Sequence, residues 1–495
     1  MQTASKKVIN GWAMFDWANS VYNLVITTTF FPIYFTTVAK NGTGQGSDII
    51  SFLGFKFVNS SLYNYSLAAA YLIIALSYPI LTSVADTRGN KKNFMRFFCI
   101  MGSFGCCMLF FFKGMDTLWL GILAFMMAAM GYVGSLVFYN AYLPEIAAPE
   151  DRDRISAKGF SFGYIGSVIM QLIGFGLVLA MPDSTTPIRI TFLLVGLWWF
   201  GFAQITFARL PKINQQDLKK VNVFKEGFKE TRRIYKEVKL KPVLKRYLRG
   251  FFFYSMGVQT VMLAATIVGS KLLGLPETKL IVTVVLIQLV AIPGAILISK
   301  LSTRLGNFRV LMGLIMLWVV ICFAGYKTAE LAEPLKPYHD QVDVLKHNKF
   351  LLKDQKASVG EIEKADKEIE TVIEKFQPQQ APVEYAFYAL AVAVGLVMGG
   401  IQSLSRSTYS KLMPQTKNTA SYFSYYDLTE KIAIVIGMFT FGFIAEYTNE
   451  HGGMKNSLLS LIIFFVIGLI WLYMALVKER QLKSTTIAAG NDNIL

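Results

Sequence analysis

Polar side chains cluster on one face of the first apolar stretch of this 495-residue chain. When the stretch is wound as a helix, one arc of about 100° holds Asp16, Asn19, Ser20 and Asn23. A carboxylate and two amides inside an apolar helix are costly, so each needs a partner or a function. We predict that this face forms a polar wall of a cavity. The alternative is that Asp16 caps a neighbouring helix or anchors a gate.

Two later stretches carry the other charged side chains. Gln402 and Arg406 are one helical turn apart, and the planar guanidinium of Arg406 suits a carboxylate. We predict that Arg406 binds an anionic group of a substrate or alternates between protein carboxylates; a permanent ion pair near the inner surface is the alternative. Asp427 and Lys431 are four residues apart and can pair along a helix, which leaves Glu430 without a local partner. The alternative for these three residues is solvation at the inner mouth.

Acids outnumber bases among these groups, with Asp16, Asp427 and Glu430 against Arg406 and Lys431. A surplus carboxylate in a low-dielectric cavity resists ionisation and can carry a proton. Proton coupling through Glu430 or Asp16 is therefore predicted. Histidine is not expected to carry the proton within the membrane, because all three histidines lie outside the apolar stretches.

The elements that must position these residues are membrane-spanning helices. Hydrophobic residues make up 54% of the chain and charged residues only 16%, against about 25% charged residues in soluble proteins. Mean hydropathy is +0.44, and the apolar residues gather into runs of about 20 or more, long enough to cross a bilayer. This composition excludes a disordered chain, a coiled coil and an ordinary soluble enzyme.

Twelve spans are predicted, and an even number puts both termini on one side of the membrane. The loops on that side carry most of the Lys and Arg residues, which indicates the cytoplasm. The predicted spans are 12–39, 62–85, 93–112, 117–141, 159–181, 189–208, 250–272, 280–299, 309–328, 385–410, 424–446 and 457–477.

The spans divide into two halves of six. The predicted parts are an N-terminal half (1–208), a basic cytoplasmic linker (209–249), a C-terminal half (250–477) and a cytoplasmic tail (478–495). The net charge is +17, but the basic residues lie mainly in short loops beside spans, so topology explains them and no nucleic-acid partner is expected. We expect the linker to lie near anionic headgroups.

A long insertion, 330–384, separates the ninth and tenth spans. Its apolar residues recur at helical spacing among many charges, with Ser358 and Gly360 near a turn. This pattern predicts an extracytoplasmic helical hairpin. The sharper alternative is a docking site for a protein partner.

Signals of enzymatic chemistry are missing from the sequence. The glycines of Gly42–Gly46 are not followed by the Lys-Ser/Thr pair of a phosphate loop. The four cysteines lie in apolar runs without the spacing of a metal or redox site. We therefore expect no cofactor, no metal and no enzymatic activity.

Several segments resemble one transporter superfamily. Asp86-Thr-Arg-Gly89-Asn-Lys91-Lys92 resembles the motif between the second and third spans of the major facilitator superfamily, in which an Asp, a Gly and a basic cluster hold these places. A narrower likeness is to its vacuole-effluxer branch, which holds the yeast vacuolar amino-acid exporters and their bacterial relatives. The segments similar to that branch are Trp12–Tyr22, Leu143-Pro-Glu145, Gly400–Ser407 and Tyr422–Lys431.

The resemblance implies an all-α polytopic membrane protein of the major facilitator fold, with twelve transmembrane helices in two six-helix halves and both termini cytoplasmic. It implies that the fourth and seventh spans line the central cavity, which would bring Asn140 and Gln259 to it. The residues that it implies for a conformational latch on the inner face, affecting turnover rather than recognition, are Asp86, Gly89, Lys91 and Lys92.

Together these features predict a secondary transporter that works by alternating access. The expected partners are a small polar or zwitterionic solute (an amino acid or short peptide), protons and the lipid bilayer, and the expected location is a bacterial inner membrane rather than a vacuolar one. The alternative is a non-transporting scaffold or sensor that binds a partner through the hairpin over 330–384.

Overall fold

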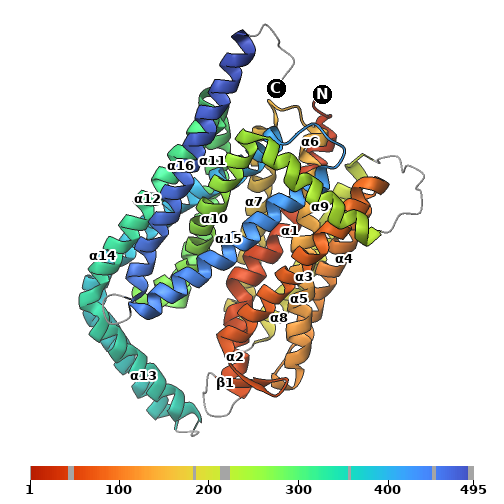
Figure 1. The fold of residues 1–495 in the computed structure, drawn as a ribbon. Helices are drawn as coiled ribbons and strands as arrows, with labels where there is room; N and C mark the ends of the chain where they lie inside the picture. The colour runs from red at the N-terminus through yellow and green to blue at the C-terminus, as the bar shows by residue number, and fades with distance from the viewer. Residues whose placement is uncertain are drawn as a thin grey trace.

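The computed structural model describes residues 2–42, 49–181, 185–211, 223–354, 358–448 and 453–488. None of the predicted site residues falls in the gaps, which lie in loops, in the insertion, in the linker and at the chain ends. The described part of the chain is almost entirely helical. Both chain ends lie at the same end of the molecule, which we call the inner end (Figure 1).

The N-terminal half contains six long helical segments and one small sheet. Its elements are α1 (Lys6–Val21), η1 (Tyr22–Phe30), α2 (Phe31–Gly42), β1 (Ile49–Phe52), β2 (Phe55–Val58), α3 (Asn59–Arg88), α4 (Lys91–Met108), η2 (Leu109–Phe111), η3 (Met115–Thr117), α5 (Leu118–Ala141), α6 (Leu143–Ile146), α7 (Arg152–Ala180) and α8 (Thr186–Arg209).

The C-terminal half follows a helix that lies at the inner end. Its elements are α9 (Val223–Leu240), α10 (Pro242–Ile267), η4 (Val268–Leu272), α11 (Glu277–Leu305), α12 (Asn307–Ala332), η5 (Glu333–Leu335), α13 (Lys336–Asp354), α14 (Val359–Leu412), α15 (Thr419–Tyr447) and α16 (Gly453–Ala488).

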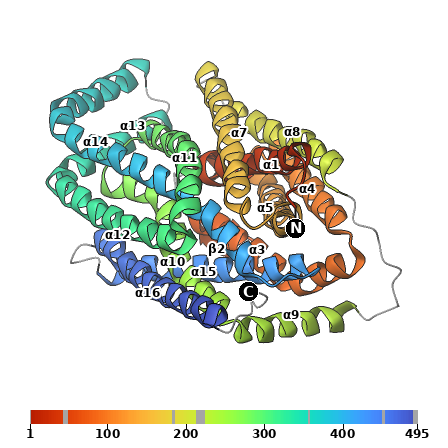
Figure 2. The same ribbon diagram turned by 90° about the horizontal axis from the view of Figure 1, so that it is seen from above.

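Eleven of the described helical segments are long and apolar enough to cross a membrane. The predicted seventh span, 250–272, is not among the eleven; it corresponds to α10 and η4, and α10 begins with the basic residues Lys245, Arg246 and Arg249. Because α10 packs against α15 and α16 within the same bundle, the fold has two six-helix halves that lie side by side (Figure 2).

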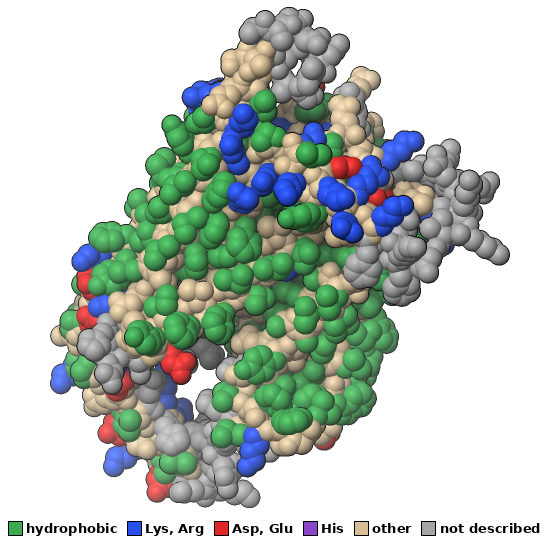
Figure 3. Space-filling view, viewed as in Figure 1, with side chains coloured by type: hydrophobic (Ala, Val, Ile, Leu, Met, Phe, Trp, Pro, Cys, Tyr) green, Lys and Arg blue, Asp and Glu red, His purple; other side chains and the backbone are tan. Residues whose placement is uncertain are grey.

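The two halves meet through equivalent helices. The main contacts join α7 to α11 and α3 to α15, so the second spanning helix of each half packs on the fifth of the other. Each half presents its second and fifth spanning helices, and each of these helices meets the other kind in the opposite half, as in a two-fold symmetric interface. Toward the outer end the bundles diverge (Figure 1), and a hollow opens between them there (Figure 3).

The first span departs from a regular helix beside its polar face. A nine-residue π-helix, η1, separates α1 from α2, and π-helical turns occur frequently at functional sites. The following connection holds an antiparallel hairpin that pairs Ile49 with Val58 and turns at Leu53 and Gly54, both with positive φ. This hairpin was not predicted from the sequence.

The insertion between the ninth and tenth spans is helical. α13 packs on the first part of α14, with the rings of Tyr338 and Phe376 stacked 4.3 Å apart. Ser358 caps α14: its hydroxyl accepts from the Glu361 amide, and its own amide donates to the Glu361 carboxylate. α14 then runs for 54 residues without interruption from the hairpin into the bundle (Figure 1).

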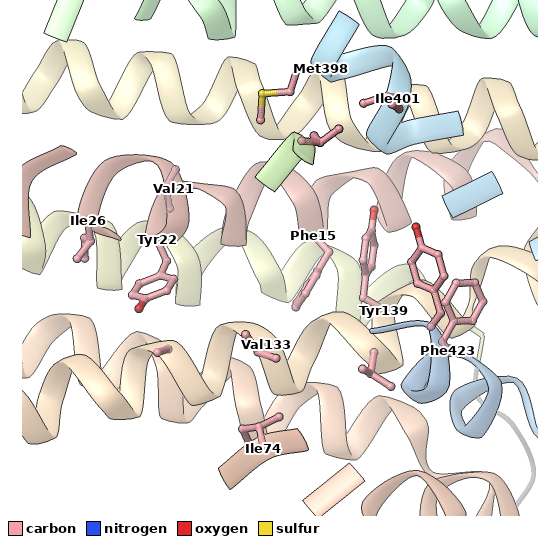
Figure 4. Packing of buried hydrophobic residues seen from close by; sticks show 14 of the residues in the cluster. Phe15, Val21, Tyr22, Ile26, Ile74, Val133, Tyr139, Met398, Ile401 and Phe423 are labelled. Atoms are coloured by element: carbon pink, nitrogen blue, oxygen red, sulfur yellow. The ribbon is translucent and has the colours of Figure 1, made fainter. Parts of the chain in front are cut away.

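Apolar residues form both the core and the outer belt. Buried side chains of α1, α5 and α14 interlock near the interface of the halves, among them Phe15, Tyr139 and Ile401 (Figure 4). A green belt of apolar side chains covers the middle of the surface in Figure 3, and Lys and Arg gather toward the inner end. This distribution is that of a protein solvated by lipid along its sides.

Candidate substrate and coupling site

An ion pair joins the two halves near the inner end. Arg406 on α14 and Asp16 on α1 are 3% and 4% exposed, and Arg406 Nη1 lies 3.3 Å from Asp16 Oδ2. The same guanidinium reaches α7, where Nε donates to Ser156 Oγ at 2.9 Å and Nη2 donates to the Ser156 carbonyl at 2.9 Å. One side chain of the C-terminal half therefore holds two helices of the N-terminal half.

Further polar and aromatic groups complete this Arg406 cluster. Tyr139 Oη donates to Asp16 Oδ2 at 2.7 Å, and Asn140 Oδ1 accepts from Arg406 Nη1 at 3.1 Å. The rings of Trp12, Tyr139 and Phe160 lie 4.3–5.5 Å from the guanidinium carbon. Hydrogen bonds and ring contacts together offset the cost of burying the charge.

Gly159 makes the close approach of these groups possible. A Cβ at this position would lie 2.5 Å from Asp16 Oδ2 and 3.0 Å from Arg406 Nη2. The ion pair therefore occupies the space that a side chain at position 159 of α7 would fill.

A second group surrounds Lys431 on α15. Its ammonium lies 3.3 Å from Glu430 Oε2 and 3.5 Å from Asp427 Oδ1. Tyr78 Oη donates to Asp427 Oδ2 at 2.6 Å, and Gln259 Nε2 donates to Glu430 Oε1 at 3.0 Å. The side chains of the three charged residues are only 6–21% exposed, so solvation at an open mouth is wrong for this conformation.

The expectation that Glu430 lacks a local partner is also wrong. It contacts Lys431 beside it and Gln259 on α10, and helical periodicity within one span revealed neither contact. The Lys431 group nevertheless keeps one more acid than base.

Three predicted residues stay outside both clusters. Asn19 is fully buried, and neither atom of its amide has a hydrogen-bond partner in the described structure. Asn23 lies in the π-helix η1 and is half-buried. Gln402 Oε1 accepts from Tyr164 Oη at 3.1 Å, which is a separate link between the halves.

The predicted latch residues form a polar network at the inner end. Asp86, at the end of α3, accepts from the backbone amides of Ala420 and Ser421 at 3.1 and 2.8 Å and from Ser421 Oγ at 2.7 Å. A carboxylate of one half thus binds the first turn of α15, the favourable end of a helix dipole. Lys91 Nζ lies 3.1 Å from Asp86 Oδ1 and 2.5 Å from Glu145 Oε1.

The other two latch residues lie at the end of α3 and in the first turn of α4. Gly89 follows α3 with φ of 62°, a left-handed conformation that glycine adopts without strain. Lys92 Nζ donates to the Leu210 carbonyl at 2.9 Å. Of the four latch residues, Asp86 and Lys91 contact the other half: Lys91 Nζ donates to Thr419 Oγ1 at 2.6 Å and to the Lys417 carbonyl at 3.2 Å.

A matching network that the sequence analysis missed lies beside α7. Asp153 Oδ2 lies 2.7 Å from Lys411 Nζ and accepts from Ser302 Oγ at 2.9 Å, while Asp153 Oδ1 accepts from Asn307 Nδ2 at 2.9 Å. The signal was a charged residue six positions before the predicted fifth span. Every partner, however, belongs to the other half, so spacing along the chain could not identify it.

α9 crosses the inner end and contacts α3 and α15. The Tyr422 hydroxyl and the Arg233 guanidinium both donate to the Glu237 carboxylate. Partial burial opposes ionisation, but these two partners outweigh it and lower the pKa of Glu237 below its ordinary value of 4.5.

The polar contacts between the halves have a one-sided distribution. They run from the latch networks through the Arg406 cluster to Gln288 Nε2, which donates to Gln171 Oε1 at 3.0 Å. Beyond this pair, toward the outer end, the bundles diverge (Figure 1). The described conformation is therefore closed at the inner end and open at the outer end.

Comparison with known proteins gives a consistent assignment. Residues 4–331 and 372–484 match the family described as vacuole effluxer Atg22 like, and the unmatched segment between them covers α13 and the start of α14. The chain is 28% identical to the MFS-type transporter YxiO of Bacillus subtilis, across 98% of this chain and 97% of YxiO. It is 24% identical to Autophagy-related protein 22 of Eremothecium gossypii, across 100% and 95%.

Solved structures share the fold. A major facilitator superfamily transporter, FucP, in the outward conformation is similar with a TM-score of 0.59 at 12% identity, across 95% of this chain and 98% of FucP. A bacterial homologue of the iron transporter ferroportin in the outward-facing state has a TM-score of 0.57 at 12% identity, across 95% and 98%.

Proposed function

The chain belongs to the vacuole effluxer Atg22-like family of the major facilitator superfamily, and on this premise we propose that it moves a small polar or zwitterionic solute by alternating access coupled to protons. Proteins of this family are integral, multi-pass membrane transporters, so this chain is a transporter and not an enzyme. A bacterial relative of nearly equal length supports the inner membrane of a bacterium as its location. An amino acid or short peptide is the proposed cargo.

The observation that carries this proposal is the Arg406–Asp16 pair. Opening the inner end requires α14 to leave α1 and α7, which breaks the contacts of Arg406 with Asp16 and Ser156. Separating a buried pair without replacement costs about 3–5 kcal/mol. A substrate carboxylate can take over the guanidinium, and a proton can neutralise Asp16, so substrate and proton together lower this barrier.

The Lys431 group supports both the cargo and the coupling. Its two carboxylates and one ammonium, together with Arg406, offer partners for the two ends of a zwitterion. Its surplus acid is the second candidate proton carrier. Glu430 is the more exposed of the two carboxylates, at 21% against 6% for Asp427, and therefore the one that solvent reaches more readily.

Transport by purified protein in liposomes tests the proposal. Labelled amino acids and dipeptides are supplied with a proton gradient, and accumulation and counterflow are measured for wild type, Asp16→Asn and Glu430→Gln. We expect both variants to lose gradient-driven accumulation and to keep counterflow, because counterflow needs no proton transfer.

Glu446→Gln is the matched control. It makes the same chemical change on the same helix, α15, at an exposed position near the outer end. Coupling through these carboxylates is refuted if Asp16→Asn and Glu430→Gln still accumulate solute, or if the control loses accumulation to the same extent.

The scaffold alternative rests on the hairpin that the family match omits. Replacing residues 336–375 with a short Gly-Ser segment distinguishes the two functions. A transporter without the hairpin still moves solute, whereas a scaffold has no transport activity with or without it.

A further inference from the structure

A cavity of about 410 Å³ lies at the inner end of the C-terminal half and shares Asn307 and Lys411 with the Asp153 network. It is open to the surface and is lined by the inner ends of α11, α12, α14 and α16, which neighbour one another in the bundle (Figures 1 and 2). Its lining includes four basic side chains and one acid: Arg309, Lys411, Arg480, Lys483 and Glu479.

The positive charge of this cationic cavity is only partly compensated within the protein. Glu479 Oε1 lies 2.9 Å from Lys483 Nζ, and Lys411 is paired with Asp153. Arg309 is exposed, and its one hydrogen bond to a described residue is to the Leu305 carbonyl of the preceding helix, at 3.5 Å. Arg480 has no hydrogen bond or ion pair in the described part of the chain. Two guanidinium groups therefore face the cavity without a carboxylate.

Two other features make the lining suitable for an amphiphilic anion. α12 begins at Asn307, in the wall of the cavity, and the first turn of a helix favours negative charge. Phe308, Leu412 and Leu476 supply apolar surface beside the charges. A ligand with a phosphate and an apolar portion would match both kinds of lining.

We propose that this cavity binds a phosphate-bearing anion through Arg309 and Arg480. Guanidinium groups match the geometry of phosphate oxygens and stay charged at all relevant pH values. The phosphate can belong to the headgroup of an anionic phospholipid or to a soluble phosphate. Glu479 repels the anion but is already neutralised by Lys483.

Lys411 connects this site to the closed inner end. The same ammonium lines the cavity and holds Asp153 of the N-terminal half. An anion that recruits Lys411 weakens that contact between the halves. Occupancy of the cavity therefore favours opening of the inner end.

Binding is tested on the full-length protein in detergent. Thermal unfolding is measured with phosphatidylglycerol against phosphatidylcholine, and with inorganic phosphate against chloride at equal ionic strength. The test variant is Arg309→Gln with Arg480→Gln. The control, Arg232→Gln with Lys236→Gln, removes the same charge from exposed positions on α9.

We expect one of the two anions to raise the unfolding temperature of wild type and control. The test variant should bind that anion at least about tenfold more weakly, since each lost charged hydrogen bond is worth about 1.5–3 kcal/mol. A response to phosphatidylglycerol alone identifies a lipid site, and a response to inorganic phosphate identifies a soluble ligand; both support the proposal.

Three results would each overturn it. One is that neither anion stabilises the wild type. The others are that the test variant binds as tightly as wild type, and that the control weakens binding equally. Arg309→Lys with Arg480→Lys checks the fold and should restore part of the affinity, because the positive charge is kept.

Discussion

Replacing Arg406 with Gln tests how strongly the buried pair closes the inner end. The substitution removes the contacts of the guanidinium with Asp16, Asn140 and Ser156 and leaves the Asp16 carboxylate, 4% exposed, with only the Tyr139 hydroxyl. An unpaired buried charge costs about 3–5 kcal/mol. Because the pair exists only while the inner end is closed, this cost falls on the closed state alone.

The expected shift toward the inner-open state is therefore about 10²- to 4 × 10³-fold. Removing both charges, with Asp16→Asn added to Arg406→Gln, should recover most of that shift, since neutral pairs of similar volume avoid the unpaired charge. The two single variants and the double variant form a cycle that isolates the pair.

Spin labels on Arg154→Cys and Lys300→Cys report the change. Both positions are exposed at the inner ends of α7 and α11, which face each other across the halves. Pulsed dipolar spectroscopy should give one short distance for wild type and a longer one for Arg406→Gln. The reasoning is refuted if the double variant is as open as the single one, because the pair would then have no part in closure.

Three further predictions concern the surrounding structure. Gly159→Ala should abolish transport, because the new Cβ would lie 2.5 Å from a carboxylate oxygen, whereas Gly201→Ala, with nothing within 4 Å, should retain wild-type uptake. Asp86→Asn should lower the turnover rate and leave substrate affinity unchanged, as measured by initial-rate kinetics and equilibrium binding, since this carboxylate touches only the inner network. The lowered pKa of Glu237 means that its contribution to docking of α9 is present above pH 4.5 and is lost as the pH falls through the lowered value. Limited proteolysis of α9 should therefore increase on acidification, and Glu237→Gln should remove that dependence.

The sequence was sufficient for the class of fold. Hydropathy and the distribution of basic residues follow directly from a lipid solvent, so spans and topology can be read locally. The seventh span shows the limit of this reasoning. α10 begins with three basic residues and is less distinctly apolar than its neighbours, and its contacts with α15 and α16 define its place in the bundle.

The candidate residues were only partly predictable. Helical periodicity put Asp427 beside Lys431, and the structure has that contact at 3.5 Å. It also put Asn19 on the face of Asp16, yet Asn19 has no partner in the described structure, whereas Asp16 meets Arg406.

The sequence by itself determined which groups had to be buried. In a bilayer each long apolar run becomes a membrane span, and a charged residue within a span must be shielded from lipid. Only the tertiary structure decided which charges neutralise one another. Arg406 pairs with a residue 390 positions away, and Lys411 with one 258 positions away. Such pairs depend on how two separate bundles meet, and helical spacing specifies only neighbours within one helix.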